Sequence, residues 1–271
     1  MTLWEGLAIL IRTKSEHNDR QDAIMTQPAL REETKTPAAL RDWLARQAAG
    51  GGGAPARPLG IAPLDRALAG GGLATVGLHC LGGLQAGAAA PLGLALAFAA
   101  RLRAGKSGPL IWVAREDFPY APGLGAFGLA AEDLLLVRAE REQALLWALE
   151  ECLRSGEAPV VLGRLQGLER VAGRRLQLAA ERGGAACLLI ETRPSGAPLP
   201  ALTRWQVAAA ASSRDAHPSL IGRVRWRLRL QQSRGGRPAE ALVEWDDATY
   251  SFSLVAASGE RDLAADAQAC G

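Results

Sequence analysis

Residues 110–114 read Leu-Ile-Trp-Val-Ala, an apolar run without a single polar side chain. A run of this length and composition is typical of a strand that is buried on both faces of a sheet. An Ala- and Leu-rich helical stretch at residues 91–103 separates it from an earlier apolar run at residues 76–81. Two strands joined through one helix are connected by a crossover, so this stretch predicts a parallel sheet.

The same alternation continues toward the C-terminus. Further apolar runs at residues 134–137, 159–162 and 187–190 predict strands. Residues 141–154 and 168–182 place apolar side chains at helical spacing, and a glycine follows each of these segments. The pattern predicts an α/β fold with a mostly parallel sheet that helices flank on both faces.

The pattern changes after residue 201. Residues 224–230, Val-Arg-Trp-Arg-Leu-Arg-Leu, alternate strictly between apolar residues and arginine, which predicts a strand with one buried and one exposed face. A Gly/Pro turn at residues 234–238 leads to apolar residues at alternate positions over 241–245, and a third such segment covers 250–254. We therefore expect the sheet to end in an antiparallel meander.

The composition is that of an ordinary globular chain. Of 271 residues, 48% are hydrophobic and 22% charged, which excludes wholesale disorder. The 31 Lys and Arg against 28 Asp and Glu leave a net charge of +3, too small to mark the whole chain as a nucleic-acid binder. The four cysteines lie far apart in the sequence with no CxxC pair, and none of the three histidines lies near a likely ligand cluster, so we expect no metal site, no disulfide framework and no cofactor.

Three regions are expected. Residues 1–58 form an N-terminal extension with a short amphipathic helix near residues 36–47 and a Gly/Pro linker; the helix either packs on its own core or docks a partner. Met25 offers a second translation start, in which case residues 1–24 are an artefact of the gene model. Residues 59–256 form the core, and residues 257–271 a flexible acidic tail.

Nothing in the sequence predicts a membrane protein. The longest apolar stretch, residues 86–100, is shorter than the ~20 residues that span a bilayer, and it contains glycine and proline. The first residues do not resemble a signal peptide. We expect a cytoplasmic protein.

The strand at residues 76–81 runs into a glycine-rich turn and then a helix, as a phosphate-binding loop does. Gly82 and Gly87 have the spacing of such a loop, but Ala88 stands at the lysine position and Ala89 at the Mg²⁺-binding Ser/Thr position. Without an ammonium and a hydroxyl, the loop loses charge-assisted contacts of roughly 1.5–3 kcal/mol each. A glycine-rich turn that serves only packing is the favoured interpretation.

Other catalytic groups are missing as well. Gly163 follows the apolar run 159–162, where a nucleoside triphosphatase carries the carboxylate that holds Mg²⁺. Glu116 and Glu191, which follow other apolar runs, have no catalytic partner in the sequence. We expect a chain shaped like a triphosphatase that is not an enzyme.

One charged segment remains as a candidate binding surface. The segment from Ala216 to Pro238 contains no acidic residue and six arginines: Arg223, Arg225, Arg227, Arg229, Arg234 and Arg237. Alternate residues of a strand lie ~6–7 Å apart on one face, a spacing that can follow a phosphate backbone. Three interpretations stay open: contact with single-stranded DNA, a protein interface, or a solvated face neutralised by Glu244 or Asp246 across the hairpin.

The order of elements, with the segment at residues 64–73 before the first core strand, is similar to the RecA-type core. Within this superfamily the chain resembles the ImuA family at residues 112–115, 120–124 and 176–181, and above all at residues 226–249. The resemblance covers residues 59–256. Alanine at positions 88 and 89 and glycine at position 163 depart from the RecA pattern and put nucleotide turnover in doubt.

The resemblance implies a non-catalytic accessory subunit of an inducible, error-prone translesion synthesis machine. Implied partners are ImuB, an inactive relative of Y-family polymerases, and an error-prone replicative-type polymerase, with RecA as a further contact; the complex would join the nucleoid after DNA damage. Two alternatives remain open. One is a cell-division inhibitor similar to SulA, and the other an active RecA-like ATPase that uses an unusual lysine such as Lys106.

Overall fold

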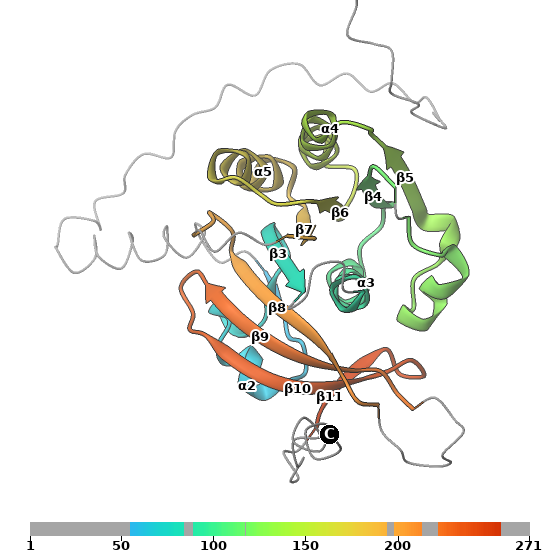
Figure 1. Ribbon diagram of the computed structural model, residues 1–271, viewed down its shortest axis with the longest axis vertical. Coiled ribbons are helices and arrows are strands. Elements are labelled where there is room, and N and C mark those ends of the chain that lie inside the picture. The colour runs from blue at the N-terminus through green and yellow to red at the C-terminus, as the bar shows by residue number, and fades with distance from the viewer. Residues whose placement is uncertain (1–54, 84–88, 117, 194–197, 213–221, 256–271) are drawn as a thin grey trace, which may run out of the picture.

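A nine-stranded sheet organises the chain, for which a computed structural model describes residues 55–83, 89–116, 118–193, 198–212 and 222–255. The strands lie in the order β11-β10-β9-β8-β3-β7-β6-β4-β5 (Figure 1). Their bounds are β3 Gly77–Gly83, β4 Leu110–Ala114, β5 Leu134–Arg138, β6 Val160–Leu165, β7 Ala186–Glu191, β8 Thr203–Ala210, β9 Arg225–Ser233, β10 Ala239–Asp246 and β11 Ser251–Leu254.

The sheet has a parallel and an antiparallel part. Strands β5, β4, β6, β7, β3 and β8 pair in parallel, and β8, β9, β10 and β11 pair antiparallel. Both the mostly parallel sheet and the antiparallel end that the sequence predicted are therefore confirmed.

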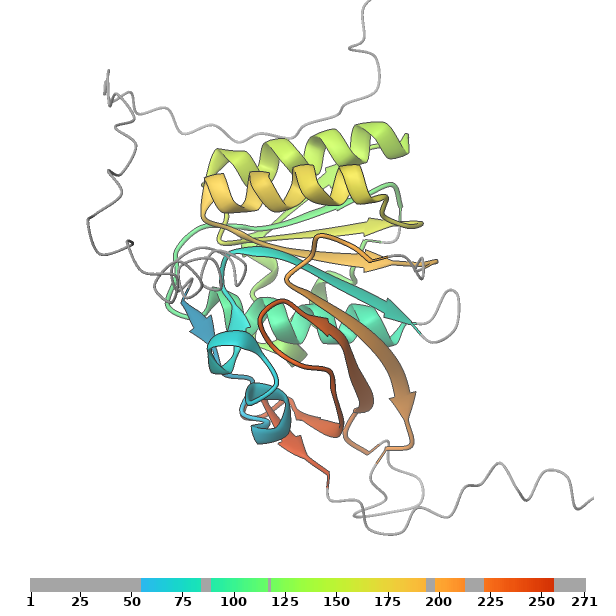
Figure 2. The same cartoon turned by 90° about the vertical axis from the view of Figure 1, so that its left-hand side faces the viewer.

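In the described part of the chain, three helices cover the two faces of the sheet. Helices α4 (Glu142–Ser155) and α5 (Arg170–Gly183) pack side by side on one face, and α3 (Ala90–Arg103) lies on the other. Figure 2 shows these layers, with the antiparallel strands curving below α3. Each face has its own apolar core, as expected for a sheet buried on both sides.

From Ala90 to Ala100, helix α3 has no charged or polar side chain on any side, as suits a helix that the curved sheet encloses; Arg101 and Arg103 stand in its last turn. All six residues from Leu94 to Ala99 are buried. The Phe98 ring meets Trp205 of β8 and Phe252 of β11 edge to face, with centroids 5.4 and 6.2 Å apart. A helix buried in this way needs no polar stripe, so the described part of the expected buried run that lies in α3, up to Ala100, is confirmed as a buried element.

A short 3₁₀ segment, η3 (Ala121–Phe127), links the two ends of the sheet. It follows β4, yet it contacts β10 at the other end: Trp245 Nε1 donates to the Ala126 carbonyl at 2.9 Å, and the Phe127 and Trp245 rings stack with centroids 5.7 Å apart. The sheet and η3 together therefore surround α3 (Figure 1).

The core is preceded by a small structured lead-in. Strand β1 (Ala56–Arg57) lies before residue 59, where the core was expected to begin, and pairs with β2 (Leu73–Ala74). Between them, α2 (Ala62–Asp65) carries Asp65, whose carboxylate accepts the backbone N–H groups of Leu59, Gly60 and Ile61 at 2.7–3.1 Å. This side chain fixes the turn that leads into the core.

The expected helix at residues 36–47, the Gly/Pro linker at 50–53, the acidic tail and residues 84–88 of the glycine-rich turn, with Gly87 and Ala88 among them, lie outside the described residues. No helix in the described part of the chain is both long and apolar enough to cross a membrane.

Candidate functional site

The turn between β3 and α3 occupies the place of a phosphate-binding loop. Gly82 is buried in β3, where Glu191 of β7 and Gln206 of β8 are its register partners. Ala89 is the N-cap of α3 and offers no side-chain cap, and a proline occupies the first turn of the helix. At Ala89 the site therefore has no hydroxyl that could hold Mg²⁺.

Gly163 does not lie where the sequence placed it. The expected end of the strand at residue 162 was wrong, because β6 continues to Leu165. Gly163 is a buried interior position, and a Cβ there would stand 2.8 Å from Leu149 of α4 and 3.0 Å from Leu189 of β7. The position faces α4, whereas the glycine-rich turn leads into α3 on the other face. A side chain at position 163 would therefore point away from the turn.

The two acidic residues that were considered as catalytic groups have different surroundings. Glu116 is exposed two residues after the end of β4. Glu191 is buried at the end of β7, where it accepts the Leu168 N–H at 3.2 Å and pairs with Arg204 at 3.5 Å. Burial raises the pKa of Glu191, while Arg204 and the Leu168 N–H act in the opposite direction. Through these contacts Glu191 connects β7 to β8 across β3, which lies between the two strands.

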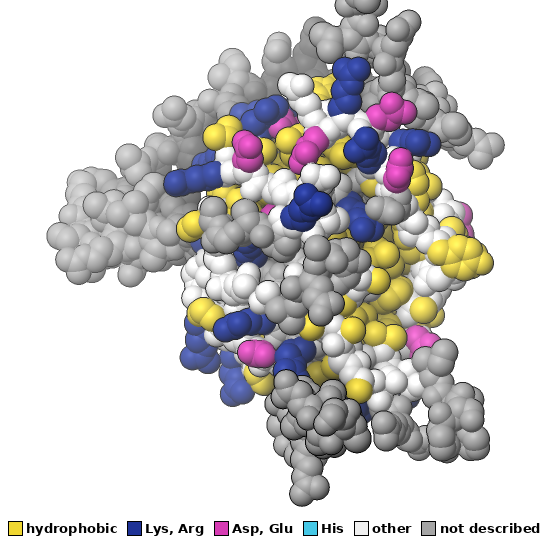
Figure 3. Space-filling model, viewed as in Figure 1, with side chains coloured by type: hydrophobic (Ala, Val, Ile, Leu, Met, Phe, Trp, Pro, Cys, Tyr) yellow, Lys and Arg dark blue, Asp and Glu magenta, His cyan; other side chains and the backbone are white. Residues whose placement is uncertain are grey.

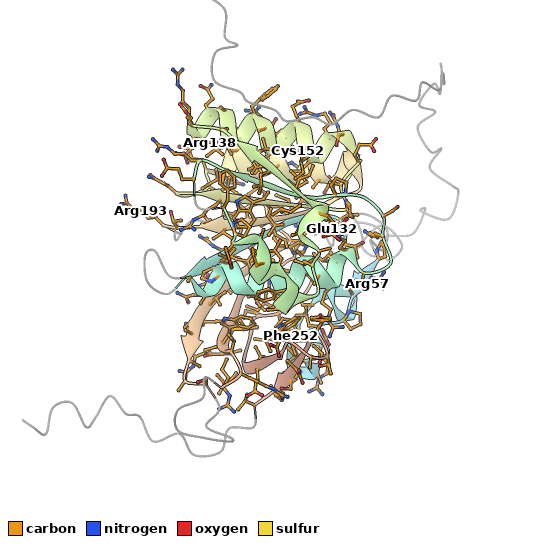
Figure 4. All side chains as sticks on the ribbon, turned by 90° about the vertical axis from the view of Figure 1, so that its right-hand side faces the viewer. Arg57, Glu132, Arg138, Cys152, Arg193 and Phe252 are labelled. Carbon is orange, nitrogen blue, oxygen red and sulfur yellow. The ribbon has the colours of Figure 1, made fainter. Side chains whose placement is uncertain are left out.

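Arginines stand at the edge of the sheet where a triphosphatase would carry carboxylates. Arg115 directly follows β4, Arg138 ends β5, Arg164 lies near the end of β6, and Arg193 follows β7 by two residues. Figure 4 shows Arg138 and Arg193 at this carboxyl edge and Glu132 at the opposite edge. These arginines were not predicted as a group, although each lies one to three residues after an apolar run.

In the described ranges, no three His, Cys, Asp or Glu side chains come together as a potential metal site. Cys80 and Cys187 are buried, and burial raises the pKa of the Cys187 thiol to about 12. Such a thiol is protonated at neutral pH and is neither a good nucleophile nor a good metal ligand.

The second candidate site is the arginine strand. In β9, Trp226, Leu228 and Leu230 point into the core around α3, as the alternation predicted. Arg225, Arg227 and Arg229 lie on the outer face of the sheet. Figure 3 shows basic side chains gathered around β9 and β10, with an acidic side chain between them.

The structure divides these arginines into two groups. Arg225 Nε lies 2.8 Å from Glu244 Oε2 on β10, and Arg223 lies 3.6 Å from Glu244 and 3.3 Å from Asp246. A backbone N–H from Ala248, followed by the charge of Arg223, lowers the pKa of Asp246. The neutralisation across the hairpin that was one of the three interpretations therefore holds for Arg223 and Arg225.

Arg227 and Arg229 differ from this first pair. Both are exposed, and neither forms an ion pair with any residue that the structure describes. Arg227 stands between Ala208 of β8 and Leu242 of β10, so its direct neighbours are uncharged. Arg229 stands between Gln206 and Glu240.

The turn between β9 and β10 places the last two arginines away from this face. Arg234 Nη2 donates to the Pro200 carbonyl at 2.9 Å, and Arg237 is exposed in the turn. Beside Arg229, an open hollow of about 550 Å³ is lined by Arg229, Leu230, Gln231, Pro238, Ala239 and Glu240. The six arginines are therefore not one continuous surface.

Comparison with known proteins identifies relatives of the chain. Protein ImuA of Caulobacter vibrioides, in two strains, is 32% identical over 227 residues, which cover 78% of this chain and 93% of that protein. Cell division inhibitor SulA of Edwardsiella piscicida is 30% identical over 116 residues, which cover 43% of this chain and 62% of that protein. No protein-family model matches the chain. The identity to ImuA extends over nearly the whole length of that relative, and the chain belongs to the ImuA family.

Proposed function

We propose that the chain is a non-catalytic accessory subunit of a DNA-damage-induced, error-prone translesion synthesis complex. Membership of the ImuA family is the observation that carries this proposal, and it supports a role in damage-induced mutagenesis. In the proposed complex, the chain holds an ImuB-like inactive Y-family polymerase and an error-prone replicative-type polymerase at damaged DNA. RecA and single-stranded DNA are further proposed contacts, and the complex joins the nucleoid after damage.

The residues around the glycine-rich turn support a role without catalysis. Nucleotide hydrolysis in P-loop proteins needs a lysine on the outer phosphates, a hydroxyl on Mg²⁺ and a carboxylate that holds the metal. This chain has Ala88 and Ala89 at the first two positions, and Gly163 is packed against α4.

Lys106 is poorly placed to replace the missing lysine. It follows α3, whereas the glycine-rich turn precedes it. The 14 residues of α3 span ~21 Å, so the helix separates Lys106 from the turn. Desolvation, followed by the charge of Arg57, lowers the pKa of Lys106, and Arg57 belongs to the lead-in at the amino end of the sheet.

Affinity capture from damaged cells tests the proposal. We expect the full chain, tagged and expressed at its natural level, to capture both polymerase-related proteins after damage and much less of either before damage. The untagged strain is the control. Failure to recover either protein after damage would overturn the adaptor role, and Mg²⁺-dependent ATP hydrolysis by the purified chain would overturn the non-catalytic one.

The partial similarity to a SulA protein supports a second candidate, inhibition of cell division. In this case, overexpression in undamaged cells would produce filaments. The adaptor function predicts normal division under the same conditions, so cell length after induction separates the two candidates.

A further inference from the structure

The outer face of β9 carries positive charge that the described residues do not balance. Arg223 and Arg225 share Glu244 and Asp246, and these four groups together are neutral. Next to them, Arg227 and Arg229 are exposed, and only Glu240 stands opposite either of them in register. The Cα atoms of two residues that are two positions apart on a strand lie ~7 Å from each other, so both guanidinium groups extend from the same small area of the face.

The chain passes close to this face where the described residues end. The backbone N–H of Val255 donates to the Leu242 carbonyl at 2.9 Å, and Leu242 is the register partner of Arg227. Neighbouring strands lie ~4.8 Å apart, so Val255 stands about two strand spacings, or ~10 Å, from Arg227.

The sequence that follows Val255 has the opposite charge. Residues 256–271 contain Glu260, Asp262 and Asp266 and a single arginine. Glu260 and Asp262 are two residues apart, which is also the separation of Arg227 and Arg229. Five extended residues span ~17 Å, so Glu260 can reach either arginine.

We propose that the acidic segment after Val255 binds back across the outer face of β9, with Glu260 and Asp262 on Arg227 and Arg229. Charge complementarity, matching separation along the chain and the exit point beside Leu242 all point to this occupant. The segment then covers the exposed half of the arginine strand.

The same face is a poorer site for single-stranded nucleic acid. Proteins that bind single strands combine a basic groove with aromatic rings on which the bases stack. The outward residues of β8, β9 and β10 include no aromatic ring, since Trp205, Trp226 and Trp245 all point into the core around α3. A covalently attached segment also has an effective concentration in the millimolar range, which favours it over a free ligand of similar affinity.

Competition by a peptide tests this proposal. The probe is a fluorescein-labelled synthetic peptide of residues 256–271, whose binding is followed by fluorescence anisotropy at low and high salt. The proteins are the full chain and a full chain with E260Q, D262N and D266N, in which the attached segment has lost its acidic charge. Thermal unfolding checks that each variant is folded.

We expect the neutralised chain to bind the peptide about tenfold more tightly than the unmodified chain, because the attached segment no longer competes. Adding R227Q and R229Q should abolish this binding. The matched control, R174Q with R182Q, removes two exposed arginines of α5 and should leave it unchanged.

Equal peptide binding by the unmodified and the neutralised chain would overturn the proposal, as would an equal loss in the α5 control. A thymidine oligonucleotide tests single-stranded nucleic acid as the alternative occupant of this face. If it binds both chains equally and needs Arg227 and Arg229, the face belongs to nucleic acid and not to the acidic segment.

Discussion

Gly93 of α3 lies directly against Trp226 of β9: a Cβ at position 93 would stand 2.8 Å from Cζ2 of the indole. Trp226 is buried and its neighbours Arg225 and Arg227 point outward, so the arginine strand is held against α3 through this contact. Only a residue without a side chain allows the strand to lie so close to the helix. The glycine therefore sets the position of the candidate binding face relative to the core.

Gly93→Ala should lower the free energy of unfolding by about 1–2 kcal/mol. Overpacking costs ~1–3 kcal/mol, and the better helix propensity of alanine returns no more than about 1 kcal/mol of it. In a Trp226→Phe background, which removes the ring that carries Cζ2, the same substitution should be neutral or stabilising. Urea unfolding of the four proteins forms a double-mutant cycle, and equal effects in both backgrounds would contradict the contact.

A buried histidine joins the lead-in to the centre of the sheet. His79 Nε2 lies 2.9 Å from the Ala74 carbonyl, so this nitrogen is the donor. The Thr203 hydroxyl then donates to His79 Nδ1 at 2.8 Å and accepts the indole N–H of Trp205 at 2.8 Å. This chain of hydrogen bonds requires a neutral imidazole, and burial lowers the pKa of His79 to about 4.

Stability should therefore fall as the pH is lowered from 7 to 5. Below its ordinary pKa near 6.5, the histidine of the unfolded chain binds a proton, while the folded chain excludes it until about pH 4. Each pH unit in this window costs ~1.4 kcal/mol, or about 2 kcal/mol between pH 6.5 and 5. Urea unfolding at pH 7 and pH 5 measures the effect.

His79→Gln is the control for this pH dependence. Glutamine can still donate to the Ala74 carbonyl but does not titrate. Between pH 7 and pH 5, the free energy of unfolding of this variant should therefore fall by about 2 kcal/mol less than that of the unmodified chain. An unchanged dependence on pH would assign the effect to other groups.

Local periodicity made much of the fold predictable. Leu-Ile-Trp-Val-Ala at residues 110–114 is buried on both faces of the parallel sheet, and Trp226, Leu228 and Leu230 alternate into the core. In both segments, burial by the sheet determines the spacing of apolar residues, so the sequence carries the signal directly.

The closure around α3 was not predictable in the same way. It depends on the bond from Trp245 to Ala126, two residues that are 119 positions apart, and on the stacking of Phe127 on Trp245. Contacts between residues so far apart in the chain produce no regular spacing of apolar residues in the sequence. The end of β6 was missed for a related reason: glycine at position 163 resembles a strand end, but it is required by the close approach of Leu149 from another element.

Restoring the phosphate-loop residues should not restore an ATPase. A chain with Ala88→Lys and Ala89→Thr still has glycine at position 163 and a Glu191 carboxylate that is engaged by Arg204 and the Leu168 N–H. We expect no Mg²⁺-dependent phosphate release above that of the unmodified chain. Adding Gly163→Asp should not help, since this side chain would meet Leu149 and Leu189 on the α4 face.

The same aspartate should be costly to the fold. Overpacking together with an unpaired buried carboxylate should lower the free energy of unfolding by about 3 kcal/mol or more, against ~1–3 kcal/mol for the control Gly163→Ala. Phosphate release and urea unfolding measure the two effects. Mg²⁺-dependent turnover by the triple variant would show that position 163 does reach the site.

Substitutions at Arg223 and Arg225 should lower the free energy of unfolding more than substitutions at Arg227 and Arg229. Arg223→Gln with Arg225→Gln leaves Glu244, which is only 8% exposed, without a cation, and should lower the free energy of unfolding by about 1–3 kcal/mol. Arg227→Gln with Arg229→Gln removes two exposed groups that have no ion pair with the described residues, so the change should stay within about 0.5 kcal/mol. Urea unfolding compares the two variants at equal net charge. If both variants lost the same free energy of unfolding, all four arginines would stabilise the fold. No arginine of the strand would then be free to bind another segment or molecule.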